Sequence, residues 1–271
     1  MRRLKRGFTL IEASLFLAIS GLLLISIIAG TQSSIAAQRF KDSVQNYVEF
    51  LRTVYSEVSN PQSPGDGRSD YAIYGKLVSF GQTYGLDGTT KIPESEQRIY
   101  VYDVVGDSAS IGTGAVAETL KALNANVVIE DKDVAGKTVS VRFAGNVQEY
   151  IPTWGAAIDD ASKTNGTPYK GSILVVRHPR SGTITTLISG TVIQVNRTVY
   201  TANNTKNFTT VRNMLKNNLS SFGAGEINFC VNPNGVNSKA DIRRNVRLVS
   251  NARNASGVDL INQDDTNNKC L

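Results

Sequence analysis

The hydrophobic pattern is most concentrated near the N-terminus, where residues 8–28 form an apolar run. Only five polar side chains interrupt it, namely Thr9, Glu12, Ser14, Ser20 and Ser26. A helix needs roughly 20 predominantly apolar residues to cross the hydrocarbon layer of a membrane. We therefore expect a transmembrane segment over residues 8–30.

Apolar residues continue beyond this run at steps of three and four, which is the spacing of one helical face. They are Ile35, Phe40, Val44, Tyr47, Val48, Leu51, Val54, Tyr55 and Val58. The pattern predicts one helix over residues 8–59, which Pro61 and Pro64 would end. Such a helix would be roughly 75 Å long at about 1.5 Å per residue. A break near Gly30, followed by a separate short helix, is the alternative.

After residue 60 the pattern changes to short β-rich runs separated by Gly, Asn, Asp and Pro. The expected strands are 72–80, 98–105, 126–130, 138–143, 172–177, 183–188, 191–200, 226–231 and 245–249. Two further helices are expected, at 115–123 and 209–219. We therefore predict an α+β fold, in which a long N-terminal helix packs on an antiparallel β-sheet head formed by residues 60–271.

Four basic residues precede the apolar run, with no acidic residue among them: Arg2, Arg3, Lys5 and Arg6. The positive-inside rule then keeps the N-terminus in the cytoplasm and exports the rest of the chain. A secretory signal peptide has a similar layout, but Glu12 counts against a disposable segment. A charge at the middle of a membrane helix costs on the order of 2.5 to 3.5 kcal/mol and usually marks a function. Glu12 therefore needs a cationic partner.

The string GFTLIE at residues 7–12, with basic residues before it and an apolar helix after it, resembles the class III leader junction of type IV pilins and type II secretion pseudopilins. The resemblance implies that residues 1–7 are a leader peptide. In that family, a membrane peptidase cuts between the residues that match Gly7 and Phe8 and methylates the new amine, here that of Phe8. It also implies that Thr9 and Glu12 serve filament assembly.

The physical argument agrees with this resemblance. Cleavage after Gly7 would create an α-amine at the start of an apolar helix, and the amine of a neighbouring subunit could then pair with Glu12. The implied protein is a structural filament subunit whose partners are other pilin subunits and the leader peptidase. It would cross the cytoplasmic membrane once before assembly and lie in an extracellular or periplasmic filament afterwards. A pilus, a type II secretion system and a DNA-uptake apparatus all remain open.

Two features favour a minor subunit over the main filament subunit. Ala29 stands where many major pilins carry a proline. The segment EINFCVNPNGVNSKADIRRNVRLVS at residues 226–250 also loosely resembles the ending of minor pseudopilins of the H type.

Charge is divided unevenly along the chain. Residues 8–160 hold 11 Lys and Arg against 18 Asp and Glu, a net of −7, whereas residues 161–271 hold 14 against 5, a net of +9. One interpretation is a dipolar subunit whose neighbours in a polymer meet plus to minus. The alternative is a minor pilin whose basic C-terminal half binds DNA or a surface ligand. That surface would be centred on Lys239, Arg243, Arg244, Arg247 and Arg253.

The two cysteines, Cys230 and Cys270, both lie in the part that the topology places outside the cytoplasm. A disulfide fits an oxidising compartment and would contribute about 3 to 4 kcal/mol by closing a loop of about forty residues. Two unpaired thiols are the alternative.

Motifs for catalysis are lacking, so we expect no enzyme, no cofactor and no metal site. His178 is the sole histidine and lies in a turn-like context, and no P-loop or G-x-S-x-G motif occurs. Acidic pairs such as Asp159 and Asp160 could hold Ca²⁺, but solvated loops account for them more simply. We expect Trp154 in the core.

Overall fold

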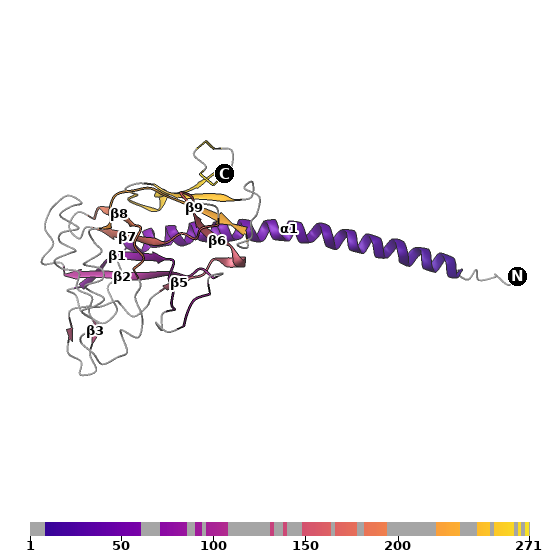
Figure 1. Ribbon diagram of the computed structural model, residues 1–271, viewed down its shortest axis with the longest axis horizontal. Helices are drawn as coiled ribbons and strands as arrows, with labels where there is room; N and C mark the ends of the chain where they lie inside the picture. The colour runs from indigo at the N-terminus through magenta and orange to yellow at the C-terminus, as the bar shows by residue number, and fades with distance from the viewer. Residues whose placement is uncertain are drawn as a thin grey trace. The chain divides into compact units, whose positions relative to one another are not determined.

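The computed structural model describes residues 9–60, 71–85, 90–93, 96–107, 131–132, 138–139, 148–163, 166–177, 182–193, 221–233, 243–249, 252–262, 265–266 and 269–270. The chain divides into two compact units, Met1–Asp42 and Ser43–Leu271. One continuous helix, α1 (Leu10–Ser59), supplies most of the described part of the first unit and opens the second (Figure 1). It has no break at Gly30, and it ends at the residue expected from the two prolines that follow.

Part of α1 is strongly apolar. Within the described residues, the segment Leu10–Ile28 is long and apolar enough to cross a membrane by its length and composition, with a mean hydropathy of 2.3.

The second unit contains two larger antiparallel sheets and one short hairpin of β3 (Asp131–Lys132) with β4 (Thr138–Val139). The five-stranded sheet has the order β5-β2-β1-β7-β8. Its strands are β1 (Tyr71–Phe80), β2 (Ile99–Asp107), β5 (Gln148–Tyr150), β7 (Gly171–Arg177) and β8 (Ile184–Ser189). The expected α+β class with antiparallel sheets is therefore confirmed.

The four-stranded sheet has the order β11-β10-β9-β6. Its strands are β6 (Ala157–Asp160), β9 (Ile227–Asn232), β10 (Arg244–Leu248) and β11 (Val258–Ile261). Every pairing in this sheet is antiparallel. Figure 1 shows these late strands in orange and yellow, apart from β6, which comes earlier in the chain.

One face of α1 forms the core of the second unit together with the sheets. Seven of its apolar side chains are almost fully buried: Val44, Tyr47, Val48, Leu51, Val54, Tyr55 and Val58. Phe229 of β9 lies at the centre, with its ring 5.6 Å from Tyr47, 5.4 Å from Phe80 of β1 and 4.9 Å from Tyr169. The predicted helical stripe from residue 44 onward is therefore a core stripe, and one aromatic ring joins the helix to both sheets.

Polar contacts also fix α1 to the sheets. The Nζ of Lys76 in β1 lies 2.7 Å from Glu57, and the Lys76 side chain is only 7% exposed. The Tyr55 hydroxyl lies 2.8 Å from the Thr186 hydroxyl of β8. Since the ion pair and the hydroxyl contact reach β1 and β8 of the same sheet, they orient the helix across it.

Sequence patterns located six of the strands in the two larger sheets to within one or two residues at each end. These are β1, β2, β7, β8, β9 and β10. The short strands β5, β6 and β11 were missed. The strand expected over 191–200 is wrong in its described part, because residues 191–193 are not in a strand. The expected strand 126–130 and the helices 115–123 and 209–219 lie outside the described residues.

Trp154 is not a core residue, contrary to expectation, because its side chain is 54% exposed. It lies in a short 3-10 turn, η2 (Thr153–Gly155), with a left-handed backbone at φ 56° and ψ 26°. The turn is held by α1, since the Ser43 hydroxyl donates to the Thr153 carbonyl at 2.9 Å. The backbone conformation of the turn directs the ring outward, which hydrophobicity alone does not predict.

Candidate functional site

The first turn of α1 brings together Thr9 and Glu12, two of the residues expected to serve assembly. Thr9 is the N-cap, because its carbonyl accepts the first helical hydrogen bond from the Ala13 amide at 3.1 Å. The Glu12 amide donates to the Thr9 hydroxyl, and the Thr9 amide donates back to the Glu12 carboxylate, both at 3.3 Å. The Thr9 hydroxyl also donates to that carboxylate at 3.3 Å. This reciprocal pattern is a capping box.

Other polar side chains in the apolar segment bond to the helix's own backbone. The Ser14 hydroxyl donates to the Ile11 carbonyl and the Ser26 hydroxyl to the Leu22 carbonyl, each at 2.9 Å. Within a hydrocarbon layer, polar groups need partners inside the protein. These serines therefore need no water, which makes the segment compatible with an apolar surrounding.

The apolar side chains of the same segment are uncovered. Those more than half exposed include Leu10, Ile11, Leu15, Phe16, Leu17, Ile19, Leu22, Leu23, Leu24, Ile25 and Ile27. A contiguous apolar surface of this kind marks a site for a membrane or another protein. This segment is accordingly the strongest candidate for a functional surface among the described residues.

The expected cleavage and methylation residues, Gly7 and Phe8, lie outside the described residues. Their position in the sequence places the Gly7–Phe8 bond directly before the N-cap Thr9.

The disulfide between Cys230 and Cys270 is present, as expected, with a sequence separation of 40. Cys230 lies in β9, and both residues are buried, at 4% and 2% exposure. The bond therefore ties the end of the chain to a central strand of the four-stranded sheet.

Arg243 does not belong to an exposed polyanion-binding surface, contrary to expectation. Its side chain is only 5% exposed, and its charge acts on Asp159 of β6. Burial raises the pKa of Asp159, while the Arg243 charge and hydrogen bonds from the Gly166 backbone and the Asn232 side chain oppose the rise. Arg243 is therefore buried, and its guanidinium is not exposed to a polyanion.

The other basic residues of that group are dispersed. Arg247 of β10 pairs with Asp259 of β11 at 2.9 Å and is partly covered. Arg244 is half-buried and donates to the Arg243 carbonyl, Arg253 is exposed, and Lys239 lies outside the described residues. The described members therefore do not form one exposed basic patch.

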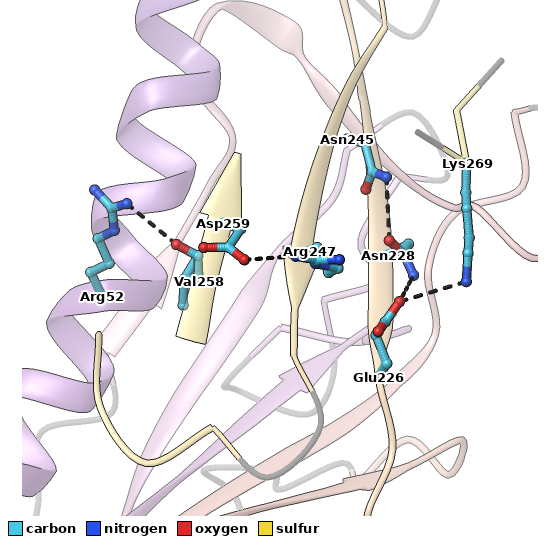
Figure 2. A network of polar contacts seen from close by, with 8 residues as sticks. All are labelled: Arg52, Glu226, Asn228, Asn245, Arg247, Val258, Asp259 and Lys269. Atoms are coloured by element: carbon cyan, nitrogen blue, oxygen red, sulfur yellow. Dashed lines mark hydrogen bonds and ion pairs between the residues drawn. The ribbon is translucent and has the colours of Figure 1, made fainter. Parts of the chain in front are cut away.

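Figure 2 shows where Arg247 lies in a row of polar contacts along the four-stranded sheet. Asn245 donates to Asn228 at 3.2 Å, Asn228 donates to Glu226 at 2.8 Å, and Lys269 lies 3.6 Å from Glu226 (Figure 2). At the other end of the row, Arg52 of α1 donates to the Val258 carbonyl of β11 at 3.3 Å (Figure 2). These charges and amides are used inside the fold, which is typical of a structural network.

A cavity of about 450 Å³ opens beside Phe80, Gln97 and Tyr169. One polar group of its lining, the Gln97 amide, is engaged with the Ile158 backbone. It accepts from the Ile158 amide at 2.6 Å and donates to the Ile158 carbonyl at 3.1 Å. The same edge of β6 is also bonded by residues 167–169, since the Tyr169 amide donates to the Ile158 carbonyl at 3.0 Å and the Asp160 amide donates to the Thr167 carbonyl at 2.9 Å.

In the described part of the chain, no group of three or more His, Cys, Asp or Glu side chains is placed to hold a metal ion. Asp160 accepts hydrogen bonds from the amide and hydroxyl of Ser162 at 2.9 and 2.6 Å and pairs with Lys163. These contacts hold the pKa of Asp160 below its usual value despite the opposing effect of burial.

Sequence reasoning missed the capping role of Thr9 and Glu12, although the signal was present. Thr-x-x-Glu directly before an apolar run is the signature of a capping box. Glu12 was interpreted only as a charge in need of a cation.

No protein-family model, curated protein sequence or solved structure matches this chain. What the protein does has to be inferred from its own residues.

Proposed function

We propose that this chain is a structural subunit of a type IV filament, a pilin or minor pilin of the pseudopilin kind. It is made with a leader over residues 1–7, cleaved and N-methylated at Phe8, and assembled with other pilin subunits through its N-terminal helix. Before assembly it crosses the cytoplasmic membrane once, with its N-terminus in the cytoplasm. Afterwards it belongs to an extracellular or periplasmic filament.

The observation that carries this proposal is the junction at residues 7–12. The leader-like string runs into an apolar helical segment, Leu10–Ile28, none of whose side chains is buried inside the chain. Since an apolar surface of this size requires a covering, the segment suits a membrane before assembly and neighbouring helices after it. The second unit supports the proposal because the side chains that α1 buries in its core, from Val44 to Val58, lie outside that segment.

A polyanion-binding minor pilin has less support. Arg243 is buried beside Asp159, and Arg247 is paired with Asp259. Polyanion binding depends on exposed cations that release counterions from the phosphates, and these two guanidinium groups are already used within the fold.

The test is mass spectrometry of the N-terminal peptide of the protein isolated from cell membranes. We expect an N-methylated Phe8 as the first residue. Substitution of Gly7 by valine should leave an uncut precursor in the membrane, since a bulky residue blocks the cleavage site. Gly21→Ala is the matched control, because a Cβ at Gly21 meets no atom within 4 Å and cleavage should proceed. An intact Met1, or a cut after residue 30, would refute the proposal.

A further inference from the structure

The cavity of about 450 Å³ in the second unit is lined by strands of both larger sheets. Phe80 of β1 and Ile99 of β2 come from the five-stranded sheet, and Ile158 of β6 comes from the four-stranded sheet. The segments that connect these strands supply the rest of the lining. Pockets for small molecules have volumes of roughly 300 to 1,000 Å³. The cavity is therefore large enough to hold a small-molecule ligand.

Much of the lining is apolar and buried. Ile92, Ile99 and Ile158 are each 5% exposed or less. Phe80 and Tyr169 are buried as well, with their ring centres 5.1 Å apart in an edge-to-face arrangement. A ligand that covers these side chains removes apolar surface from water, which favours binding. The lining thus fits a compact apolar body.

Hydrogen bonds of the main chain hold the walls of the cavity in place. The Ile92 amide donates to the Thr83 carbonyl at 3.0 Å, and the Tyr169 amide donates to the Ile158 carbonyl at 3.0 Å. All four residues line the cavity. A site whose walls are fixed before the ligand arrives loses less conformational freedom on binding. The cavity is therefore preformed.

Two cations of the lining are not used within the fold. Arg98 is paired with Glu96 at 2.9 Å and with Glu149 at 3.0 Å. Lys91 and Lys170 are exposed, and neither forms an ion pair with another residue in the described part of the chain. An ammonium group on a flexible four-carbon stem can move to meet an anion at the opening.

An adjoining hollow of about 430 Å³ does not have this excess of positive charge. It shares Lys91, Glu96 and Arg98 with the cavity, and its further charged residue is Glu149. Its lining therefore has two cations and two acids, whereas the cavity has three cations and one acid. The preference for an anion accordingly belongs to the cavity and not to the whole surface around it.

Lys170 is positioned by a glycine. Gly81 has a left-handed backbone at φ 73°, a conformation that favours glycine. A Cβ on Gly81 would lie only 2.7 Å from the Cγ of Lys170. The stem of Lys170 thus lies directly against the Gly81 backbone, and both residues line the cavity. This contact fixes the start of the stem beside the cavity and leaves the ammonium group free to move.

We propose that the cavity binds a small molecule that has a compact apolar body and one carboxylate. The body covers the buried isoleucines and the aromatic pair, and the carboxylate meets the ammonium groups of Lys91 and Lys170. The inference concerns the second unit alone, and it does not rest on the proposed role as a filament subunit.

NMR of isoleucine methyl groups, in the full chain in lipid nanodiscs, tests where a ligand binds. The probe is 2-naphthoate. The methyl signals of Ile92, Ile99 and Ile158 should shift along one saturable curve, which gives the affinity. Isoleucines of the apolar segment, such as Ile19, respond to probe that enters the lipid and are the internal control.

The neutral analogue 2-naphthamide tests the need for a carboxylate. The wild type should bind 2-naphthoate roughly fivefold more tightly than 2-naphthamide, about the effect of two exposed charge contacts. The double variant Lys91→Gln/Lys170→Gln should lose this preference and keep the wild-type affinity for 2-naphthamide, which also shows that the cavity is still folded. Lys163→Gln/Lys269→Gln is the matched control, because it changes the net charge equally and neither residue lines the cavity. It should keep the preference.

Three results would overturn the inference. Shifts confined to isoleucines of the apolar segment would mean that the cavity does not take the probe. Equal affinity of the wild type for 2-naphthoate and 2-naphthamide would mean that the carboxylate is not recognised. Equal loss of the preference in both double variants would assign the effect to net charge and not to Lys91 and Lys170.

Discussion

The N-terminal apolar segment Leu10–Ile28 and the unit formed by residues 43–271 differ in where their side chains find partners within the chain. In the apolar segment, the hydrogen bonds of polar side chains join residues three or four positions apart, such as Ser26 to the Leu22 carbonyl. In the second unit, side-chain contacts join distant parts of the chain, such as Tyr55 to Thr186. In the first region, Glu12, Ser14 and Ser26 thus have hydrogen-bond partners close by in the sequence, whereas the apolar side chains around them are exposed.

The contrast is clearest within α1, because both regions use the same helix. Leu23 is 58% exposed, whereas Leu51, which has the same side chain, is 3% exposed. Helical propensity cannot account for this difference. What differs is the spacing of apolar residues, which is continuous in the apolar segment and restricted to one face from residue 44 onward. A helix that is apolar all round needs a covering from outside its own chain.

The largest predicted effect concerns the disulfide. Replacing Cys230 and Cys270 together with alanine should lower the free energy of unfolding of the head by about 3 to 4 kcal/mol, since the bond closes a loop with a separation of 40 residues. Denaturant unfolding of the detergent-solubilised full chain measures this. Membrane sedimentation of the variant should match that of the wild type, because the bond lies wholly in the second unit. A matching loss of membrane association would mean that the two regions are not independent.

An effect of similar size separates the two leucines of α1. Leu51→Ala should lower the free energy of unfolding of the second unit by about 2 to 5 kcal/mol, as large-to-small substitutions in a core do. Leu23→Ala should change head stability by less than about 0.5 kcal/mol, as an exposed position does. Unfolding midpoints of the two variants, measured side by side, test this. Equal costs at both positions would show that the apolar segment is buried by its own chain.

Much of the fold could be predicted from local signals. The end of α1 at Ser59 follows from Pro61 and Pro64, and strands such as β1 and β7 follow from runs of β-branched and aromatic residues. The pairing of the two cysteines could be predicted because the chain has no other cysteine. Each of these features depends on residues close together in the sequence or on the composition of the whole chain.

The features that could not be predicted depend on tertiary pairing. The strands β6 and β11 have four residues each, and they exist because β9 and β10 offer them edges. The burial of Arg243 depends on the tertiary fold, and so does the effect of its charge on Asp159, an acid distant in the sequence. Charge counting along the chain could therefore find the basic stretch, but not which of its members are already neutralised by a partner.

The smallest predicted effect is a change in how the free energy of unfolding depends on pH, and it concerns Tyr55 of α1. Burial raises the pKa of the Tyr55 hydroxyl from 10.0 to about 12, and the hydrogen bond with Thr186 offsets only part of the rise. Below pH 10 the hydroxyl is neutral in both the folded and the unfolded chain. Between pH 10 and 12 the unfolded chain loses the proton more readily than the folded chain, so the free energy of unfolding falls as the pH rises, by about 1 kcal/mol per pH unit.

At pH 8, the free energy of unfolding of Tyr55→Phe should be lower than that of the wild type by about 1 kcal/mol, the value of one hydrogen bond. From pH 10 to pH 11, it should fall less than that of the wild type. The difference between the two chains should shrink by about 1 kcal/mol over that step, because the unfolded tyrosine is already half deprotonated at pH 10. Tyr84→Phe is the control, because the Tyr84 side chain is 40% exposed and its loss should leave the wild-type pH dependence in place. An unchanged alkaline slope in Tyr55→Phe would show that its hydroxyl reaches water, and that α1 is less firmly packed on the head than its buried face implies.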